Sequence, residues 1–241
     1  MKNTAIIIPA RLGAKRFRNK PLVKINGIPM IIHVLNRAKE SRVGKVFVAT
    51  PDSEIIDIVK KNGGQAILTL NDHPNGTSRT FEVFTKLKDK TIDFIINLQG
   101  DLPAIQTQCI KKLSQLMIEN ECQIGTLASS LNKDEIHDKN IVKVKVEEKL
   151  QEDNFLKAID FFRTKKNLEN KNIYHHIGIY AFTKDALAQY VKLSRSELEV
   201  ERNLEQMRAM ENNMVIKVGL SHSTPLSVDT ELDLIKVMKQ L

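Results

Sequence analysis

AIIIPARLGAKRFRNKP, residues 5–21, is an apolar run followed at once by a loop with five cations and no carboxylate. The run 5–8 is typical of a strand that is buried on both faces of a parallel sheet. In an open α/β sheet, ligands bind beyond the carboxyl ends of the strands, so a site is expected in the loop that leaves this strand. Its guanidinium and ammonium groups suit an anion with several charges, such as a triphosphate. They also fit a solvated basic loop, but Pro9, Gly13 and Pro21 stiffen this loop and favour a ligand.

Two familiar phosphate-binding loops are absent from this stretch. A Walker loop needs a second glycine followed by Lys-Ser or Lys-Thr, and here Lys20 is followed by Pro21. The dinucleotide fingerprint G-x-G-x-x-G needs three glycines, and the loop contains only Gly13. The sequence therefore predicts that phosphate is bound by cationic side chains rather than by a cradle of backbone amides.

Apolar runs alternate with stretches of helical spacing along the chain. The runs predict strands over residues 4–8, 45–49, 65–68, 92–98, 141–146, 174–182 and 214–220. The helical spacing predicts helices over residues 30–41, 53–62, 77–88, 106–119, 196–212 and 230–241. This order predicts an α/β fold with a doubly wound, mostly parallel sheet and an inserted antiparallel segment. We expect one domain over residues 1–241, with a less regular segment at about 131–182.

The composition is that of an ordinary globular protein. Apolar residues are 41% and charged residues 27% of the 241 residues, and no apolar run reaches the roughly eighteen residues that a spanning helix needs. The apolar N-terminal stretch ends at Pro9, too early for a signal peptide, so we expect a cytoplasmic protein without membrane insertion. Cys109 and Cys122 match no redox or zinc spacing and are interpreted as reduced thiols. The net charge of +8 favours an anionic partner.

A series of short motifs follows the Pro9-Ala10-Arg11 motif in order along the chain. They are Arg16, Lys20-Pro21-Leu22, Asn26-Gly27, Pro29-Met30, Val48-Ala49-Thr50, Gly63-Gly64, Asn71-Asp72-His73, Gly76-Thr77, Arg79, Asn97-Leu98-Gln99-Gly100-Asp101, His176 to Tyr180, Leu204-Glu205-Gln206 and Val228-Asp229-Thr230. In this order the motifs resemble those of the 3-deoxy-manno-octulosonate cytidylyltransferase family of CMP-sugar synthetases. The resemblance extends from the first apolar run to the C-terminus.

The resemblance implies an enzyme that transfers CMP from CTP to the anomeric hydroxyl of a 3-deoxy sugar acid, releasing pyrophosphate, for lipopolysaccharide or capsule synthesis. Such a reaction needs in-line positioning and charge neutralisation more than covalent help from the protein. The implied catalytic residues are Arg11, Arg16, Lys20 and Asp101, and the implied Mg²⁺ ligands are Asp101 and Asp229. The implied CTP-binding residues are Ala10, Leu12, His73, Gly76, Arg79 and Gln99, and the sugar-binding residues are Arg163, His176, Glu205 and Gln206. The family also implies a homodimer, with dimer contacts and the sugar pocket in the segment after Ser130.

Structural roles fit several of these residues equally well. Asp229 precedes Thr-Glu-Leu-Asp and suits a helix cap, and His73 suits a turn without a ligand. His176 suits a core histidine on a strand, and Glu205 suits a solvated helix position.

Some positions depart from the family pattern. Leu102 stands where the family usually has glutamate, Ser78 where it has an acidic residue, Ser227 where it has glycine, and residues 164–167 replace a proline-rich segment. These changes leave two alternatives open: the same fold acting on another keto-sugar acid, and a non-catalytic CTP-binding homologue. A nucleic-acid binder is a third class, but the chain has no Trp, three Tyr and no recognised nucleic-acid motif, so nucleic acid is not expected as a partner.

Overall fold

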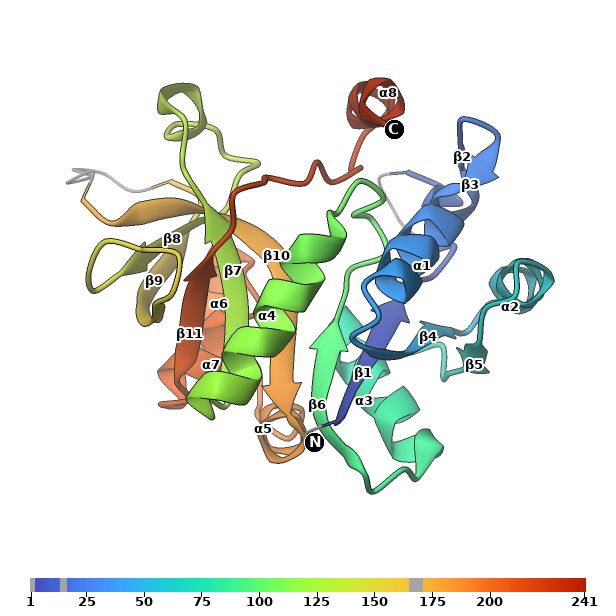
Figure 1. Cartoon of the computed structure of the whole chain (residues 1–241), viewed down its shortest axis with the longest axis horizontal. Helices are drawn as coiled ribbons and strands as arrows, with labels where there is room; N and C mark the ends of the chain where they lie inside the picture. Colours follow the sequence, from blue (N-terminus) through green and yellow to red (C-terminus); the bar gives the residue numbers. More distant parts are fainter. Residues whose placement is uncertain (1–2, 14–16, 165–170) are drawn as a thin grey trace. The chain divides into compact units, whose positions relative to one another are not determined.

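The computed structural model describes residues 3–13, 17–164 and 171–241 (Figure 1). Backbone contacts divide the chain into two compact units: unit 1 comprises Met1–Lys111 and Pro225–Leu241, and unit 2 comprises Lys112–Thr224. A division into compact units does not decide whether the chain folds as one domain, so the single domain over residues 1–241 remains a prediction. Among the described helices, none combines the length and apolar composition that crossing a bilayer requires.

Unit 1 contains a parallel sheet that begins with the apolar run of the N-terminus. The strand order is β5-β4-β1-β6, with β1 at Asn3–Pro9, β4 at Gly44–Thr50, β5 at Ala66–Leu68 and β6 at Ile92–Asn97. In β1 every residue from Thr4 to Ile8 is buried, as expected for a strand covered on both faces. Ile6 pairs with Val46 on β4 and with Ile96 on β6, so β1 lies inside the sheet.

Helices connect these parallel strands. They are α1 at Met30–Glu40, α2 at Ser53–Lys61 and α3 at Gly76–Leu87, and α4 follows β6 at Thr107–Asn120. A short 3-10 helix, η1 at Lys20–Leu22, and a hairpin of β2 at Lys24–Ile25 and β3 at Ile28–Pro29 lie between β1 and α1. The predicted alternation of strands and helices is confirmed here, with boundaries that agree to within two residues.

Unit 2 contains a mixed sheet. Its strands are β7 at Ile124–Ser129, β8 at Lys143–Val146, β9 at Phe155–Phe162, β10 at Ile173–Thr183 and β11 at Ile216–Leu220. They follow the order β10-β7-β11-β9-β8, and β8 also pairs with β10, so the strands close into a ring. β7 and β11 are parallel, whereas β10–β7, β10–β8, β8–β9 and β9–β11 are antiparallel.

The prediction of a mostly parallel sheet is therefore wrong for unit 2. A parallel neighbour needs a crossover of a dozen or more residues, and the connection from Val146 to Phe155 is too short for one. Neighbouring strands that are joined by a short connection, such as β8 and β9, therefore pair antiparallel. The predicted antiparallel segment is present, but it forms a larger part of the fold than a simple insertion.

The helices of the second half differ from the prediction in two places, one of which is an additional helix at Lys184–Tyr190. α5 lies at Lys184–Tyr190, α6 at Glu197–Arg202, α7 at Met207–Glu211 and α8 at Glu231–Gln240, and the short η2 lies at Lys133–Glu135. The single helix predicted over residues 196–212 is wrong, because Asn203 adopts a left-handed backbone with φ 51° and separates α6 from α7. In unit 1, Val228 and Val237 pack with Ile25, Met30 and Ala104, which holds the C-terminal segment on the β2–β3 hairpin and α1.

Candidate active site

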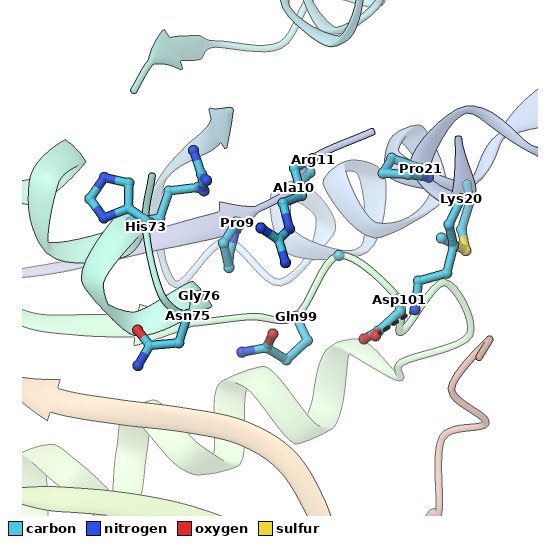
Figure 2. A pocket seen from close by; sticks show the side chains of 13 residues that line it. Pro9, Ala10, Arg11, Lys20, Pro21, His73, Asn75, Gly76, Gln99 and Asp101 are labelled. Carbon is cyan, nitrogen blue, oxygen red and sulfur yellow. Dashed lines mark hydrogen bonds and ion pairs between the residues drawn. The ribbon is translucent and has the colours of Figure 1, made fainter. Parts of the chain in front are cut away.

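A cavity of about 210 Å³ in unit 1 contains most of the residues predicted to bind the nucleotide (Figure 2). It lies beyond the ends of β1 and β6, beside the first turn of α3 and next to η1. The lining residues are Pro9, Ala10, Arg11, Lys20, Pro21, Met30, His73, Asn75, Gly76, Arg79, Gln99, Gly100 and Asp101. Leu12 is outside this lining, and Arg16 lies outside the described residues.

Lys20 joins two carboxylates that come from distant parts of the chain. Its Nζ lies 2.9 Å from Asp101 Oδ2 and 3.2 Å from Asp229 Oδ1. The Lys20 side chain is only 16% exposed, so its charge is largely removed from water. Burial acts to lower the pKa of Lys20, but the charges and hydrogen bonds of Asp101 and then Asp229 outweigh it and raise the pKa above its usual value. The ammonium therefore stays charged as the common partner of both aspartates.

Backbone contacts hold these three residues in place. Asn19, just before Lys20, adopts a left-handed backbone with φ 53°, which asparagine tolerates well, and its N–H donates to Leu12 O at 3.3 Å. The N–H of Val228 donates to Asp101 O at 3.0 Å, which places the following Asp229 beside the end of the β6 loop. The carboxylates thus converge through the fold and not through sequence proximity, since Lys20 and Asp229 are 209 positions apart.

Glycines allow the chain segments to approach closely at the cavity floor. A Cβ on Gly100 would lie 2.9 Å from Pro9 O, and one on Gly76 would lie 3.1 Å from Pro9 Cγ. A side chain at Gly100 would therefore require a backbone shift, whereas one at Gly76 would press on the ring of Pro9. Gln99 points its amide into the cavity while its Nε2 donates to Asn97 Oδ1 at 3.2 Å (Figure 2).

Gln99 is supported by Asn97, which belongs to a network of buried polar side chains. Asn97 is 1% exposed, donates to Thr77 Oγ1 at 3.1 Å and accepts from Thr80 Oγ1 at 3.3 Å. The Gln99 side chain is half-buried, and its hydrogen bond to this buried Asn97 favours one orientation of its amide. A preorganised amide at this position can discriminate between hydrogen-bonding edges of a nucleobase.

The loop after β5 is held by Arg79. Its Nη1 donates to Leu70 O at 2.9 Å and to Thr69 Oγ1, and its Nη2 donates to Asn71 O at 3.3 Å. Burial lowers the pKa of Arg79, and the nearby charge of Arg11 lowers it further. Arg79 lines the cavity, but its hydrogen bonds in this structure go to the protein itself.

His73 is held in the cavity wall by two side chains of α3. Its Nδ1 lies 3.1 Å from Ser78 Oγ, and its Nε2 contacts Glu82 Oε2. The Ser78 hydroxyl itself donates to Asn75 O at 3.0 Å. Glu82 also accepts from Lys86 Nζ at 2.6 Å.

Glu82 was not among the residues predicted from the sequence. Burial acts to raise its pKa, but hydrogen bonds from Lys86, His73 and the Leu70 N–H together lower the pKa from 4.5 to about 2. Its position one helical turn after Ser78 was the available signal, because residues four apart share a helix face. The family usually has an acidic residue at the position of Ser78. In this chain Glu82, on the same helix α3, supplies a carboxylate instead.

Leu12 and Leu102 play backbone and core roles in this structure. The N–H of Leu12 donates to Asp52 Oδ2 at 2.8 Å, and the N–H of Ala10 donates to Ala49 O at 2.9 Å, so the start of the basic loop is fixed to the end of β4. Leu102 is 4% exposed and turns into the protein rather than toward the cavity. Among the lining residues that the structure describes, Asp101 is thus the one with an acidic side chain.

The residues predicted to bind the sugar all lie in unit 2. His176 on β10 is buried, and its Nε2 lies 3.0 Å from Thr126 Oγ1. Burial, with a smaller contribution from the charge of His175, lowers the pKa of His176 to about 3, so the ring is neutral at physiological pH. Arg163, at the end of β9, donates to Asn140 O at 2.8 Å and to Lys139 O at 3.3 Å.

Glu205 and Gln206 occupy the turn between α6 and α7. The hydroxyl of Tyr190 lies 2.9 Å from Glu205 O and 3.2 Å from Glu205 Oε1. Gln206 is 9% exposed. The structure thus places His176, Arg163, Glu205 and Gln206 in unit 2 and the predicted nucleotide and metal residues in unit 1.

A family model described as cytidylyltransferase matches residues 5–216. Curated relatives named 3-deoxy-manno-octulosonate cytidylyltransferase include one from Afipia carboxidovorans, 44% identical, and one from Rhodopseudomonas palustris, 41% identical. Each alignment covers 96% of this chain and 94% of the relative. The chain belongs to the 3-deoxy-manno-octulosonate cytidylyltransferase family. The resemblance inferred from the motifs is confirmed.

A solved structure agrees with this membership of the cytidylyltransferase family. The structure of a CMP:2-keto-3-deoxy-manno-octonic acid synthetase complexed with CTP superposes with a TM-score of 0.90 at 36% identity, covering 99% of this chain and 98% of that chain. That protein was solved with CTP bound.

Proposed function

We propose that this chain transfers CMP from CTP to the anomeric hydroxyl of 3-deoxy-manno-octulosonate and releases pyrophosphate. The observation that carries the proposal is the meeting of Lys20 with Asp101 and Asp229 at a cavity built from β1, β6 and α3. A cation between two carboxylates beside a pocket suits the binding of a metal–triphosphate. The names of the relatives supply the nucleotide and the acceptor.

Asp101 and Asp229 fit Mg²⁺ as ligands. Both present carboxylate oxygens to one cation, and Mg²⁺ is typically bound by one or two carboxylates together with substrate phosphates. Within the described residues, no group of three or more His, Cys, Asp and Glu side chains could hold a metal alone, so phosphate and water would complete the coordination. When bound, Mg²⁺ would neutralise charge on the phosphate oxygens.

The basic side chains of this chain act on the triphosphate in the proposal. Lys20 exchanges the two aspartates for phosphate oxygens, and Arg11, which lines the cavity, adds a second positive charge. Arg16 is proposed to join them from the same loop. These charges stabilise the departing pyrophosphate, which is the main electrostatic demand of the reaction.

The cavity wall selects the base. The amide of Gln99 and the backbone of Ala10 line the cavity beside Gly76 and His73, and the network behind Gln99 holds its amide in one orientation. A base with the wrong hydrogen-bonding edge would leave such buried polar groups unpaired, which is a strong basis for rejection. We propose that Leu12 acts through its backbone N–H, which binds Asp52, and that Arg79 stabilises the cavity wall by its hydrogen bonds to the loop after β5.

Unit 2 supplies the acceptor site in this proposal. Arg163 offers a cation for the carboxylate of the sugar acid, and His176, Glu205 and Gln206 offer partners for its hydroxyl groups. The neutral state of His176 supports hydrogen bonding to a hydroxyl rather than ion pairing. The proposal includes a homodimer in the cytoplasm that serves lipopolysaccharide or capsule synthesis.

The decisive assay measures pyrophosphate released from CTP, Mg²⁺ and 3-deoxy-manno-octulosonate. Wild type is expected to release it, and Asp101→Asn is expected to lose at least about a hundredfold in kcat, because a carboxylate at the proposed metal site is removed while the fold is kept. Release only with another keto-sugar acid would reassign the acceptor. Magnesium-dependent CTP binding without product from any such acid would show a non-catalytic CTP-binding protein.

A further inference from the structure

Arg11 lies between two peptide groups that are anchored at the end of β4. The N–H of Ala10 donates to Ala49 O at 2.9 Å, and the N–H of Leu12 donates to Asp52 Oδ2 at 2.8 Å. The first of these contacts joins two backbones, so it does not depend on a side chain. The second depends on the carboxylate of Asp52, which is 40 positions away from Leu12 in the sequence. The placement of Arg11 at the cavity is therefore linked to a side chain outside the cavity lining.

Asp52 occupies the N-cap position of α2, but its side chain does not cap that helix. An aspartate at this position usually accepts a hydrogen bond from an N–H of the first helical turn. Within the described residues, the Asp52 side chain accepts no such bond. Its Oδ2 contacts the Leu12 N–H and, at 3.5 Å, the hydroxyl of the buried Thr50, whose Oγ1 accepts from the Asp52 N–H at 3.2 Å. The carboxylate is thus directed to the loop that contains Arg11.

The charge of Asp52 is unfavourable for an anionic ligand. Burial and the charge of Arg11 lower the pKa of Arg79, whereas the charges of Glu82 and Asp52 act to raise it. Arg79 lines the cavity, so a negative charge that acts on its guanidinium also repels a triphosphate bound there. A favourable effect of Asp52 on CTP binding must therefore come from its hydrogen bond to Leu12 and not from its charge.

We propose that Asp52 is a positioning residue that holds the Leu12 peptide and thereby keeps Arg11 in place for the triphosphate of CTP. The inference rests on the proposed function, in which Arg11 contributes a positive charge to the triphosphate. Asp52 acts through the loop and does not touch the nucleotide. Without this anchor, the start of the loop would have to be ordered when CTP binds, and the entropy cost of that ordering would weaken binding.

Asp52→Ser and Asp52→Asn separate the anchor from the helix cap. Serine and asparagine are both favourable N-cap residues, so α2 is expected to persist in both variants. Asparagine keeps a carbonyl oxygen that can accept from the Leu12 N–H, whereas the serine side chain is too short to reach it. Calorimetry with CTP and Mg²⁺ should give a Kd that rises roughly three- to tenfold in Asp52→Ser, as expected for the loss of one hydrogen bond. Asp52→Asn should bind CTP at least as tightly as wild type, because it keeps the acceptor and removes the unfavourable charge.

Asp57→Ser is the matched control, because Asp57 is exposed on the same helix and loses the same carboxylate. Its Kd for CTP should equal that of wild type. Equal Kd values in Asp52→Ser and Asp52→Asn, or an equal rise in Asp57→Ser, would overturn the inference. Thermal unfolding midpoints should agree between Asp52→Ser and Asp52→Asn. A lower midpoint in the serine variant would instead assign Asp52 to the stability of α2.

A double-mutant cycle tests whether Asp52 acts through Arg11. In an Arg11→Ala background, Asp52→Ser should cause no further rise in the Kd for CTP, because the side chain to be positioned is absent. Additive effects would contradict the inference. A failure of the proposed function looks different: wild type would bind CTP and release no pyrophosphate, and the comparison of Kd values does not depend on that release.

Discussion

Lys20 has no distinctive feature on its own, and its role follows from its neighbours. A lysine in a basic loop, an aspartate after a strand and an aspartate before a helix each have an ordinary explanation. Only their convergence, with Nζ–O distances of 2.9 and 3.2 Å, indicates a site. In this structure the Lys20 ammonium balances charges that a metal–nucleotide complex would otherwise balance.

Replacing Lys20 with methionine tests this residue. Lys20→Met leaves the Asp101 and Asp229 carboxylates without their common cation and removes a positive charge from the cavity. We expect KM for CTP to rise about tenfold or more and kcat to fall, measured by pyrophosphate release. Lys24→Met is the matched control, because Lys24 is exposed on β2 and outside the cavity lining. Equal kinetics in both variants would remove Lys20 from the proposed mechanism.

Glu82 gives a prediction for stability against pH. Its pKa is about 2 in the folded protein against an ordinary 4.5, so its stabilising effect is present above pH 4.5 and is lost as the pH falls toward 2. Glu82→Gln removes this titration. Urea denaturation should therefore show a gap in unfolding free energy between wild type and Glu82→Gln at pH 6 that shrinks at pH 3.

The control for Glu82 is an exposed glutamate in a loop of unit 2. Glu148 is exposed and lies outside helices and strands. Glu148→Gln should differ little from wild type at pH 6. A gap between wild type and Glu82→Gln that is the same at both pH values would contradict the assigned role.

At the scale of elements, the sequence predicted the parallel strands of unit 1 well and the strands of unit 2 less completely. Runs such as Ile6-Ile7-Ile8 carry a strong signal because branched side chains pack on both faces of the sheet. β7, with the sequence IGTLAS, is fully buried but built partly of small residues, and β9, with the sequence FLKAIDFF, has charged residues at Lys157 and Asp160 within the strand. Neither gave an apolar run, so neither was predicted, and α5 is too short to show a period.

The break between α6 and α7 has a local cause in Asn203. Its φ of 51° ends α6, and its N–H caps the helix on Glu199 O. A β-branched residue is strained at positive φ, so Asn203→Val should cost about 1–2 kcal/mol of unfolding free energy. Asn203→Gly should be close to neutral, because glycine adopts this conformation without strain.

Chemical denaturation measures both Asn203 variants. The quantity to compare is the unfolding free energy of Asn203→Val against that of Asn203→Gly. Both variants lose the asparagine side chain, so its contribution cancels in the comparison. Valine and glycine variants of equal stability would show that the left-handed backbone does not impose the break.

At the scale of the whole molecule, the residues of the candidate site are far apart in the sequence and meet only in the folded chain. The sequence predicted Lys20, Asp101 and Asp229 through motif order, but their contact depends on the C-terminal segment returning to unit 1 through Val228 and Val237. Arg79 shows the opposite case: its motif is present, and its hydrogen bonds hold the Leu70 loop. Motifs predict which residue types matter, while topology decides which of them meet.

In the proposed mechanism, Asp101, Asp229 and Lys20 bind the metal and the triphosphate of CTP. The most direct measurement is an anomalous difference map from crystals grown with CTP and Mn²⁺ as a substitute for Mg²⁺. We expect a manganese peak bonded to oxygens of Asp101, Asp229 and a phosphate of CTP, with Lys20 Nζ moved from the carboxylates to the phosphates. A manganese peak away from both aspartates, or CTP bound with its triphosphate outside this cavity, would contradict it.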